Sequence, residues 1–182
     1  MRELSLHVMD IVQNSLSAGA SLTEISVTEQ GKQMAIAIID NGRGMSQEQV
    51  KSVIDPFFTT RTTRKVGLGV PLFKMAAEQT GGSFSISSEL GAGTRLTAVF
   101  QTTSVDMIPL GDINSTISLL IRCNPDRDFL FRRAKDGKEF TLDTRELRRV
   151  LGEGVALDAP EVMEWIDAYL AEQTETIFGG TI

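Results

Sequence analysis

The stretch MAIAIIDNGRGM, residues 34–45, joins an apolar run to an aspartate and two glycines. Its first six residues are all apolar, as expected of a buried strand. Asp40 follows directly, and a carboxylate at the end of a buried strand loses solvation unless a fixed donor binds it. The amino group of a purine in a closed pocket is one such donor, with Gly42 and Gly44 allowing close approach of the ring and Met45 supplying an apolar wall. A surface Asn-Gly turn is the alternative interpretation.

Helical and strand patterns flank this stretch on both sides. Leu4, Val8, Ile11 and Ser15 recur at spacings of three and four, which predicts a helix over residues 3–18. Further along, the patterns predict a hairpin, a short helix, a longer helix and a second hairpin, over residues 23–40, 46–54, 70–80 and 83–100. This order of elements predicts an α+β fold, a two-layer α/β sandwich with helices on one face of the sheet.

Pro109 and Gly111 mark a boundary in the second half of the chain. We expect residues 1–103 to form one domain and residues 104–182 to form a small α+β extension that serves as a partner-binding or regulatory module. In the extension, the sequence predicts a helix behind the N-cap candidate Asp112. It also predicts a hairpin and two more helices, over residues 128–142, 144–152 and 159–172.

Composition narrows the class of protein. The chain has 182 residues, 41% hydrophobic and 23% charged, which is typical of a globular protein. Its net charge is −6, so neither nucleic acid nor an anionic membrane is an expected partner. It shows no apolar stretch near the roughly 18 residues of a membrane span and no leader, so we expect a cytoplasmic protein. Cys123 can form no internal disulfide and is expected to be a small buried residue.

Asp10 and Asn14 stand four residues apart, on one edge of the first predicted helix. The amide oxygen of Asn14 suits Mg²⁺, a hard cation that recruits phosphate and water oxygens as further ligands. Asp10 can orient or deprotonate a water molecule or a hydroxyl group. Either residue taken singly is also compatible with an exposed helix side chain.

The stretch KVGLGVPLFK, residues 65–74, places a Gly-x-Gly turn at the start of a predicted helix. The backbone amides of Gly67, Leu68 and Gly69, with the positive end of the helix dipole behind them, can bind phosphate. The stretch lacks the third glycine of the dinucleotide-binding fingerprint, and the sequence contains no Gly-Lys-Ser/Thr. The predicted phosphate site is therefore of neither common type.

Five motifs occur in a fixed order: Asn14 within DIVQNSLSAGA, then IIDNGRGM, DPFFTTR, GLGVPLFKMAAEQTGG and GAGTRLTAVF. Together they resemble the nucleotide-binding motifs of the GHKL superfamily. That group includes DNA gyrase B subunits, the heat-shock ninety chaperones, the catalytic domains of histidine kinases and the mismatch-repair ATPases. The resemblance covers about residues 3–101 and is nearest to the histidine-kinase branch. It implies a Bergerat-type ATP-binding fold with ATP and Mg²⁺ as ligands.

The resemblance also implies roles for matching residues. Asn14 matches the magnesium-binding asparagine, Asp40 the adenine-binding aspartate, and Thr94 the hydroxyl group near that aspartate. Nucleotide contacts are further expected of Ser17, Gly42, Gly44, Met45, Gly67, Leu68 and Gly69.

The segment FFTTRTTRKV, residues 57–66, corresponds by the same resemblance to the ATP lid. Three basic residues in it can neutralise the triphosphate when the lid closes, namely Arg61, Arg64 and Lys65. A solvated loop is the alternative for this charge cluster.

Two features depart from the superfamily pattern. Gyrase-type ATPases carry a glutamate four residues before the asparagine as the base that activates water, whereas this chain has the shorter Asp10. Histidine kinases carry a phospho-accepting histidine well upstream, whereas the only histidine here is His7. We therefore expect no autonomous histidine kinase, and we expect His7 to be a partly buried imidazole.

The leading hypothesis is a protein that binds Mg-ATP and uses binding or slow hydrolysis to regulate a protein partner docked on residues 104–182. The alternative is a protein kinase acting in trans, similar to the serine kinases that regulate sigma factors. A third class is a sensor that binds the nucleotide without cleaving it. The sequence is also compatible with a homodimer.

Overall fold

The computed structural model describes residues 2–55 and 68–179 of the chain. In this part of the chain the elements are, in order, α1 (Leu4–Ser17), β1 (Leu22–Gln30), β2 (Gln33–Asp40), α2 (Gln47–Ile54), α3 (Gly69–Gln79), β3 (Ser83–Glu89), β4 (Gly93–Gln101), α4 (Ile113–Cys123), β5 (Asp128–Lys135), β6 (Lys138–Asp143), α5 (Thr144–Leu151) and α6 (Pro160–Phe178).

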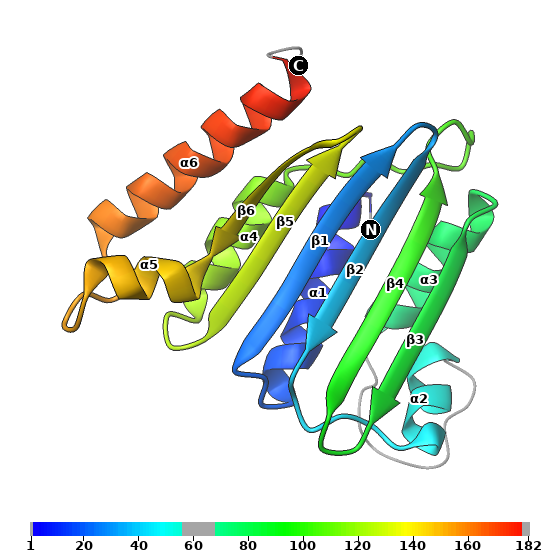
Figure 1. The fold of residues 1–182 in the computed structure, drawn as a ribbon. Coiled ribbons are helices and arrows are strands. Elements are labelled where there is room, and N and C mark those ends of the chain that lie inside the picture. Colours follow the sequence, from blue (N-terminus) through cyan, green and yellow to red (C-terminus); the bar gives the residue numbers. More distant parts are fainter. Residues whose placement is uncertain (1, 56–67, 180–182) are drawn as a thin grey trace.

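The strands form a single mixed sheet with the order β3-β4-β2-β1-β5-β6. β1 and β5 pair in parallel, and the other neighbouring strands pair antiparallel. Figure 1 shows α1, α3 and α4 side by side on one face of this sheet, and α1 contacts both of the other two. The predicted α+β class and the two-layer sandwich are confirmed.

One hydrophobic core lies between the sheet and the helices. Phe73 of α3 and Phe100 of β4 are fully buried, and their ring centroids are 5.6 Å apart. Phe131 of β5 and Ile166 of α6 are fully buried in the same core. Burial of aromatic and aliphatic side chains from both halves of the chain therefore stabilises one common structure.

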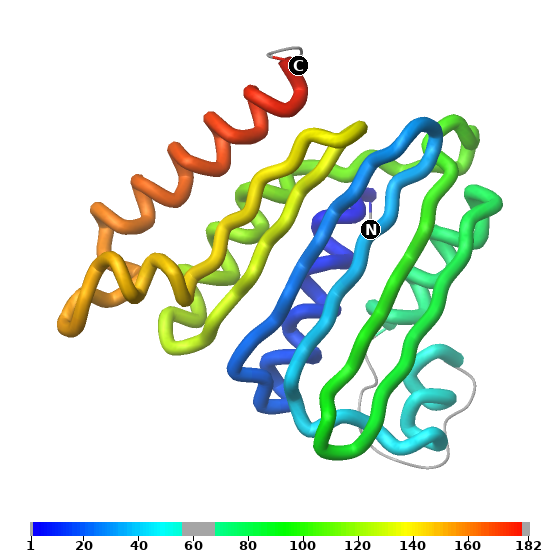
Figure 2. Tube along the Cα trace, in the orientation of Figure 1, coloured from blue at the N-terminus to red at the C-terminus, as the bar shows by residue number. Residues whose placement is uncertain are grey.

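The C-terminal elements extend the sheet that the N-terminal elements begin. Figure 2 shows β5 running beside β1, and the amide of Asp128 donates to the carbonyl of Ser21 over 2.9 Å where this pairing starts. α6 packs against α4, β5 and β6. Residues 1–103 and 104–182 thus share one sheet and one core, and their division into two domains stays a prediction.

Local details test several expectations. The capping box of Ser46 and Gln49 is present at the start of α2. The expectation that Cys123 is buried is wrong, because the residue ends α4 on the solvent side of that helix. Within the described ranges, none of the helices combines the length and apolar character needed to cross a membrane.

Candidate functional site

Asp40 ends β2 with its carboxylate held at both oxygens. The buried Ser15 of α1 donates from Oγ to Oδ2 of Asp40 over 2.7 Å, and the amide of Gly42 donates to Oδ1 over 2.9 Å. These donors come from a helix and from the turn that follows the strand. The half-buried carboxylate therefore has a fixed orientation, and its remaining lone pairs can accept hydrogen bonds from a ligand.

Three hydroxyl-bearing residues share the row of Asp40 across the sheet. Thr23 of β1 and Thr94 of β4 are its register partners on the two neighbouring strands. Ser88 of β3 is in turn the partner of Thr94. Thr23 is fully buried, and its hydroxyl has no hydrogen-bond partner among the described residues. The sheet thus places a carboxylate within a row of small polar side chains.

The glycines after Asp40 permit close backbone contacts within the chain. A Cβ atom at Gly42 would lie 2.9 Å from the carbonyl oxygen of Ala18, at the end of α1. Gly44 has φ = +72°, and a Cβ there would collide with the carbonyl oxygen of Glu89. Both glycines therefore allow the turn after β2 to pack closely, against the end of α1 at Gly42 and against the end of β3 at Gly44. This requirement is independent of any bound ligand.

The edge of α1 carries the other polar candidates. Asp10, Asn14 and Ser17 are exposed and follow one another at steps of four and three, so they lie on one side of the helix. A Cβ atom at Gly69, in the first turn of α3, would lie 3.1 Å from Cβ of Asp10. The start of α3 and the edge of α1 are thus in direct contact. Ser15 of the same helix donates to Asp40, so α1 connects the end of β2 with the start of α3.

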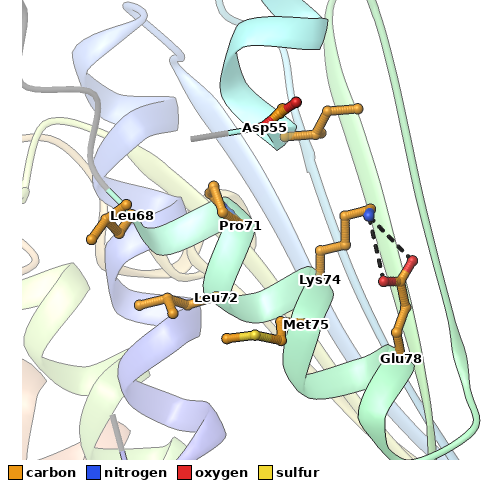
Figure 3. A pocket seen from close by; sticks show the side chains of 8 residues that line it. Asp55, Leu68, Pro71, Leu72, Lys74, Met75 and Glu78 are labelled. Atoms are coloured by element: carbon orange, nitrogen blue, oxygen red, sulfur yellow. Dashed lines mark hydrogen bonds and ion pairs between the residues drawn. The ribbon is translucent and has the colours of Figure 1, made fainter. Parts of the chain in front are cut away.

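The remaining lid and phosphate candidates are Arg61, Arg64, Lys65 and Gly67, and these lie outside the described residues. Leu68 precedes α3 with its side chain exposed. It lines a pocket of about 480 Å³ between the end of α2 and the outward side of α3, shown in Figure 3. The lining residues are Ile54, Asp55, Leu68, Pro71, Leu72, Lys74, Met75 and Glu78. Asp10, Asn14 and Asp40 are not among them.

Three residues of the site were missed in the sequence. Ser15 belongs to the buried stripe of α1, where a hydroxyl group in line with Leu4, Val8 and Ile11 was the available signal. Asn41 accepts hydrogen bonds from the amides of Ser21 and Leu22 over 2.9 and 3.0 Å, so it fixes the start of β1. Ser88 accepts from the amide of Met45 over 2.8 Å. These contacts cross between elements, and periodicity does not reveal them.

His7 lies one helical turn from Asp10 on α1 and is almost fully buried, where partial burial was expected. Its ring stacks on Phe73 of α3 with the centroids 5.7 Å apart. Burial of the imidazole lowers the pKa of His7, because an apolar environment disfavours the charged form. Its Nδ1 atom has no hydrogen-bond partner in the described part of the chain.

Comparison with known proteins agrees with this geometry. Residues 2–104 match the family described as Histidine kinase-, DNA gyrase B-, and HSP90-like ATPase. The chain belongs to this family. The GHKL superfamily, as the family is also known, binds ATP, and the predicted membership is confirmed.

Two curated relatives with similar sequences are named as kinases. The chain is 32% identical over 92 residues to Sensor histidine kinase ZraS of Escherichia coli O157:H7, which covers 50% of this chain and 20% of the relative. It is 34% identical over 93 residues to Sporulation kinase D of Bacillus subtilis strain 168, covering 50% and 18%. The chain thus spans about a fifth of the length of these relatives.

Solved structures show the same fold at low sequence identity. The Aquifex aeolicus MutL ATPase domain complexed with ADP has a TM-score of 0.51 and 16% identity, covering 83% of this chain and 69% of that chain. The N-terminal domain of a DNA repair protein has a TM-score of 0.55 and 16% identity, covering 85% and 58%. Both alignments extend beyond residues 2–104, since they cover more than four fifths of this chain.

Proposed function

We propose that this protein binds Mg-ATP at Asp40 and α1, and that binding or slow hydrolysis regulates a protein partner. The observation that carries the proposal is the Asp40 carboxylate, which Ser15 and Gly42 orient at the end of a buried strand. Such a fixed acceptor suits the amino group of adenine. Family membership supports the same ligand.

The residues on the edge of α1 fit a magnesium triphosphate. Asn14 offers an exposed amide oxygen, a hard ligand of the type that Mg²⁺ prefers. When bound, Mg²⁺ would neutralise charge on the phosphates. The start of α3 at Gly69 would bind phosphate through its amides, with Asp10 beside it to orient a water molecule or an acceptor hydroxyl. Roles for Ser17 and for the lid residues Arg61, Arg64, Lys65 and Gly67 stay predictions.

A second candidate function is phosphoryl transfer in trans to a protein. The curated relatives named as kinases favour it. Positioning the acceptor hydroxyl beside Asp10 would supply much of the rate. A sensor that binds ATP without cleaving it is the third candidate, and an assay must distinguish it from an ATPase and from a kinase.

The partner, the oligomeric state and the location complete the proposal. We place the partner surface on residues 104–182, where α5 and α6 lie far from α3 (Figure 1). A homodimer is one arrangement of such a surface. A cytoplasmic setting agrees with the exposed, unpaired thiol of Cys123.

Nucleotide-dependent stability tests the binding step. Mg-ATP at a hundredfold excess over its dissociation constant should raise the unfolding free energy by about 2.7 kcal/mol. The Asp40→Ala variant should lose this gain, whereas Asp158→Ala, at an exposed site on the extension, should keep it. No gain in the wild type, or an equal gain in Asp40→Ala, contradicts the assignment.

Labelled nucleotide then separates the three outcomes. With γ-³²P-ATP and a cell extract, label in free phosphate indicates hydrolysis, and label on a protein indicates a kinase. Intact labelled ATP that stays bound indicates a sensor.

A further inference from the structure

Ser88 forms three hydrogen-bond contacts next to the site. Its Oγ accepts from the amide of Met45 over 2.8 Å. The same oxygen lies 2.9 Å from the carbonyl oxygen of Gly93 and 2.8 Å from Oγ1 of Thr94.

Only one arrangement of hydrogens satisfies all three contacts. The carbonyl of Gly93 cannot donate, so the single hydroxyl hydrogen of Ser88 must lie between Ser88 and Gly93. Without it, two oxygens would face each other at 2.9 Å with no hydrogen between them. Ser88 then has no hydrogen left for Thr94. The hydroxyl of Thr94 must therefore donate to Ser88, and Ser88 is fully used as one donor and two acceptors.

Thr94 is consequently left with lone pairs and no hydrogen for a ligand. It is the register partner of Asp40 on the neighbouring strand, and directly opposed residues place their Cβ atoms about 4.5–5.5 Å apart. The Asp40 carboxylate also only accepts. Two adjacent strands thus present acceptors alone to whatever base lies against them.

We propose that Ser88 is a positioning residue that holds Thr94 as an acceptor, so that Asp40 and Thr94 select a base edge with an amino group over one with a carbonyl group. The inference rests on the proposed ATP site and deepens it. An amino group supplies two N–H donors, whereas a 6-oxopurine has an oxygen at that position and a single N–H donor, at N1. Its oxygen therefore faces lone pairs, and at least one of the two acceptors stays unpaired. A site with unpaired polar groups discriminates strongly between such ligands.

The test compares ATP with inosine triphosphate, in which a carbonyl replaces the 6-amino group. Dissociation constants for both, with Mg²⁺, are measured for the wild type and for Ser88→Ala, Thr94→Val and Ser87→Ala. Ser87 is the neighbouring exposed residue of β3 and serves as the matched control. Circular dichroism and thermal unfolding establish that each variant is folded.

The wild type should prefer ATP. In Ser88→Ala, the Thr94 hydroxyl is free to turn its hydrogen toward the ligand, so affinity for inosine triphosphate should rise and the ATP preference should fall roughly 5- to 30-fold. Thr94→Val removes the hydroxyl, so it should weaken ATP binding without strengthening inosine triphosphate binding. Ser88→Thr keeps a hydroxyl at this position and should restore the preference.

Several results would overturn the inference. An unchanged preference in Ser88→Ala, or an equal loss of affinity for both nucleotides, would reduce Ser88 to a structural role. If Ser88→Ala does not fold, a wild-type preference retained in Thr94→Val refutes the role of Thr94. A wild type that binds neither nucleotide would overturn the proposed function together with this inference, whereas ATP binding with unchanged selectivity would overturn only the inference.

Discussion

Asp40 depends on a residue that its own motif does not contain. The stretch around it indicates a carboxylate at the end of a buried strand, and this much is visible in the sequence. Its orientation comes from Ser15, which lies 25 positions earlier. Ser15 follows Asn14 directly, and because successive helical residues point about 100° apart, one turns to the sheet while the other turns to solvent. α1 thus contributes to both parts of the proposed nucleotide site, through Ser15 next to Asp40 and through Asn14 at the proposed magnesium position.

His7 makes stability depend on pH. Its folded pKa lies below the ordinary value of about 6.5, so between these two values the unfolded chain binds the proton and the folded chain does not. The unfolding free energy should therefore fall as the pH drops from about 7.5 through the folded pKa of His7. Urea unfolding at several pH values measures this change.

The His7→Phe variant is the comparison for that experiment. A phenyl ring keeps the aromatic contact with Phe73 and cannot be protonated. Its unfolding free energy should decrease less than that of the wild type over the same pH range. Equal slopes for the two proteins would rule out His7 as the source.

Hairpins and caps are the elements that short stretches of sequence determine. The turns at Gly31 and Gly137 and the capping box at Ser46 occur where the patterns predict them, because each depends on neighbours a few residues away. The parallel pairing of β1 with β5 was not predicted. It depends on contacts between residues more than a hundred positions apart, about which local periodicity carries no information.

Packing of the turn after β2 against the β3–β4 hairpin can be measured with two glycines. Gly44 and Gly91 both have positive φ angles, of +72° and +82°. A Cβ at Gly91 meets nothing within 4 Å, whereas one at Gly44 collides with Glu89. We expect Gly91→Ala to lower the unfolding free energy by about 1–2 kcal/mol from backbone strain alone. Gly44→Ala should cost about 1–3 kcal/mol more.

Chemical denaturation of both variants gives this difference. Because both positions require a positive φ, the difference between the two losses of unfolding free energy reports the contact between the turn and the hairpin. Equal losses would mean that the hairpin moves away at little cost.

At the scale of the molecule, the described residues of both halves of the chain share one sheet and one hydrophobic core, which the sequence did not predict. Pro109, Gly111 and the charge, which is balanced over residues 1–100 and acidic over residues 101–182, indicate two parts. Yet β5 and β6 continue the sheet, and their side chains enter the same core. Composition describes surfaces, whereas the sharing of a core depends on tertiary contacts. For the same reason the order of the motifs indicated the family, but not how the extension is attached.

Shared burial predicts cooperative unfolding. Phe131 lies on β5 with its side chain fully buried, although β5 follows the predicted domain boundary. Phe131→Ala should lower the unfolding free energy by about 3–5 kcal/mol. The variant and the wild type should each unfold in one transition, and ATP binding should be lost in that same transition. Two calorimetric transitions in the wild type would instead support separate domains.

The parallel pairing of β1 with β5 also has a consequence during translation. When only the first hundred residues have been synthesised, one edge of β1 is unpaired, because its partner β5 begins at Asp128. An unpaired strand edge in the middle of a future sheet is a template for pairing with other nascent chains. Synthesis of residues 128–135 closes that edge. We therefore expect a polypeptide stopped at residue 103 to aggregate in cells, even though it carries all five nucleotide-binding motifs.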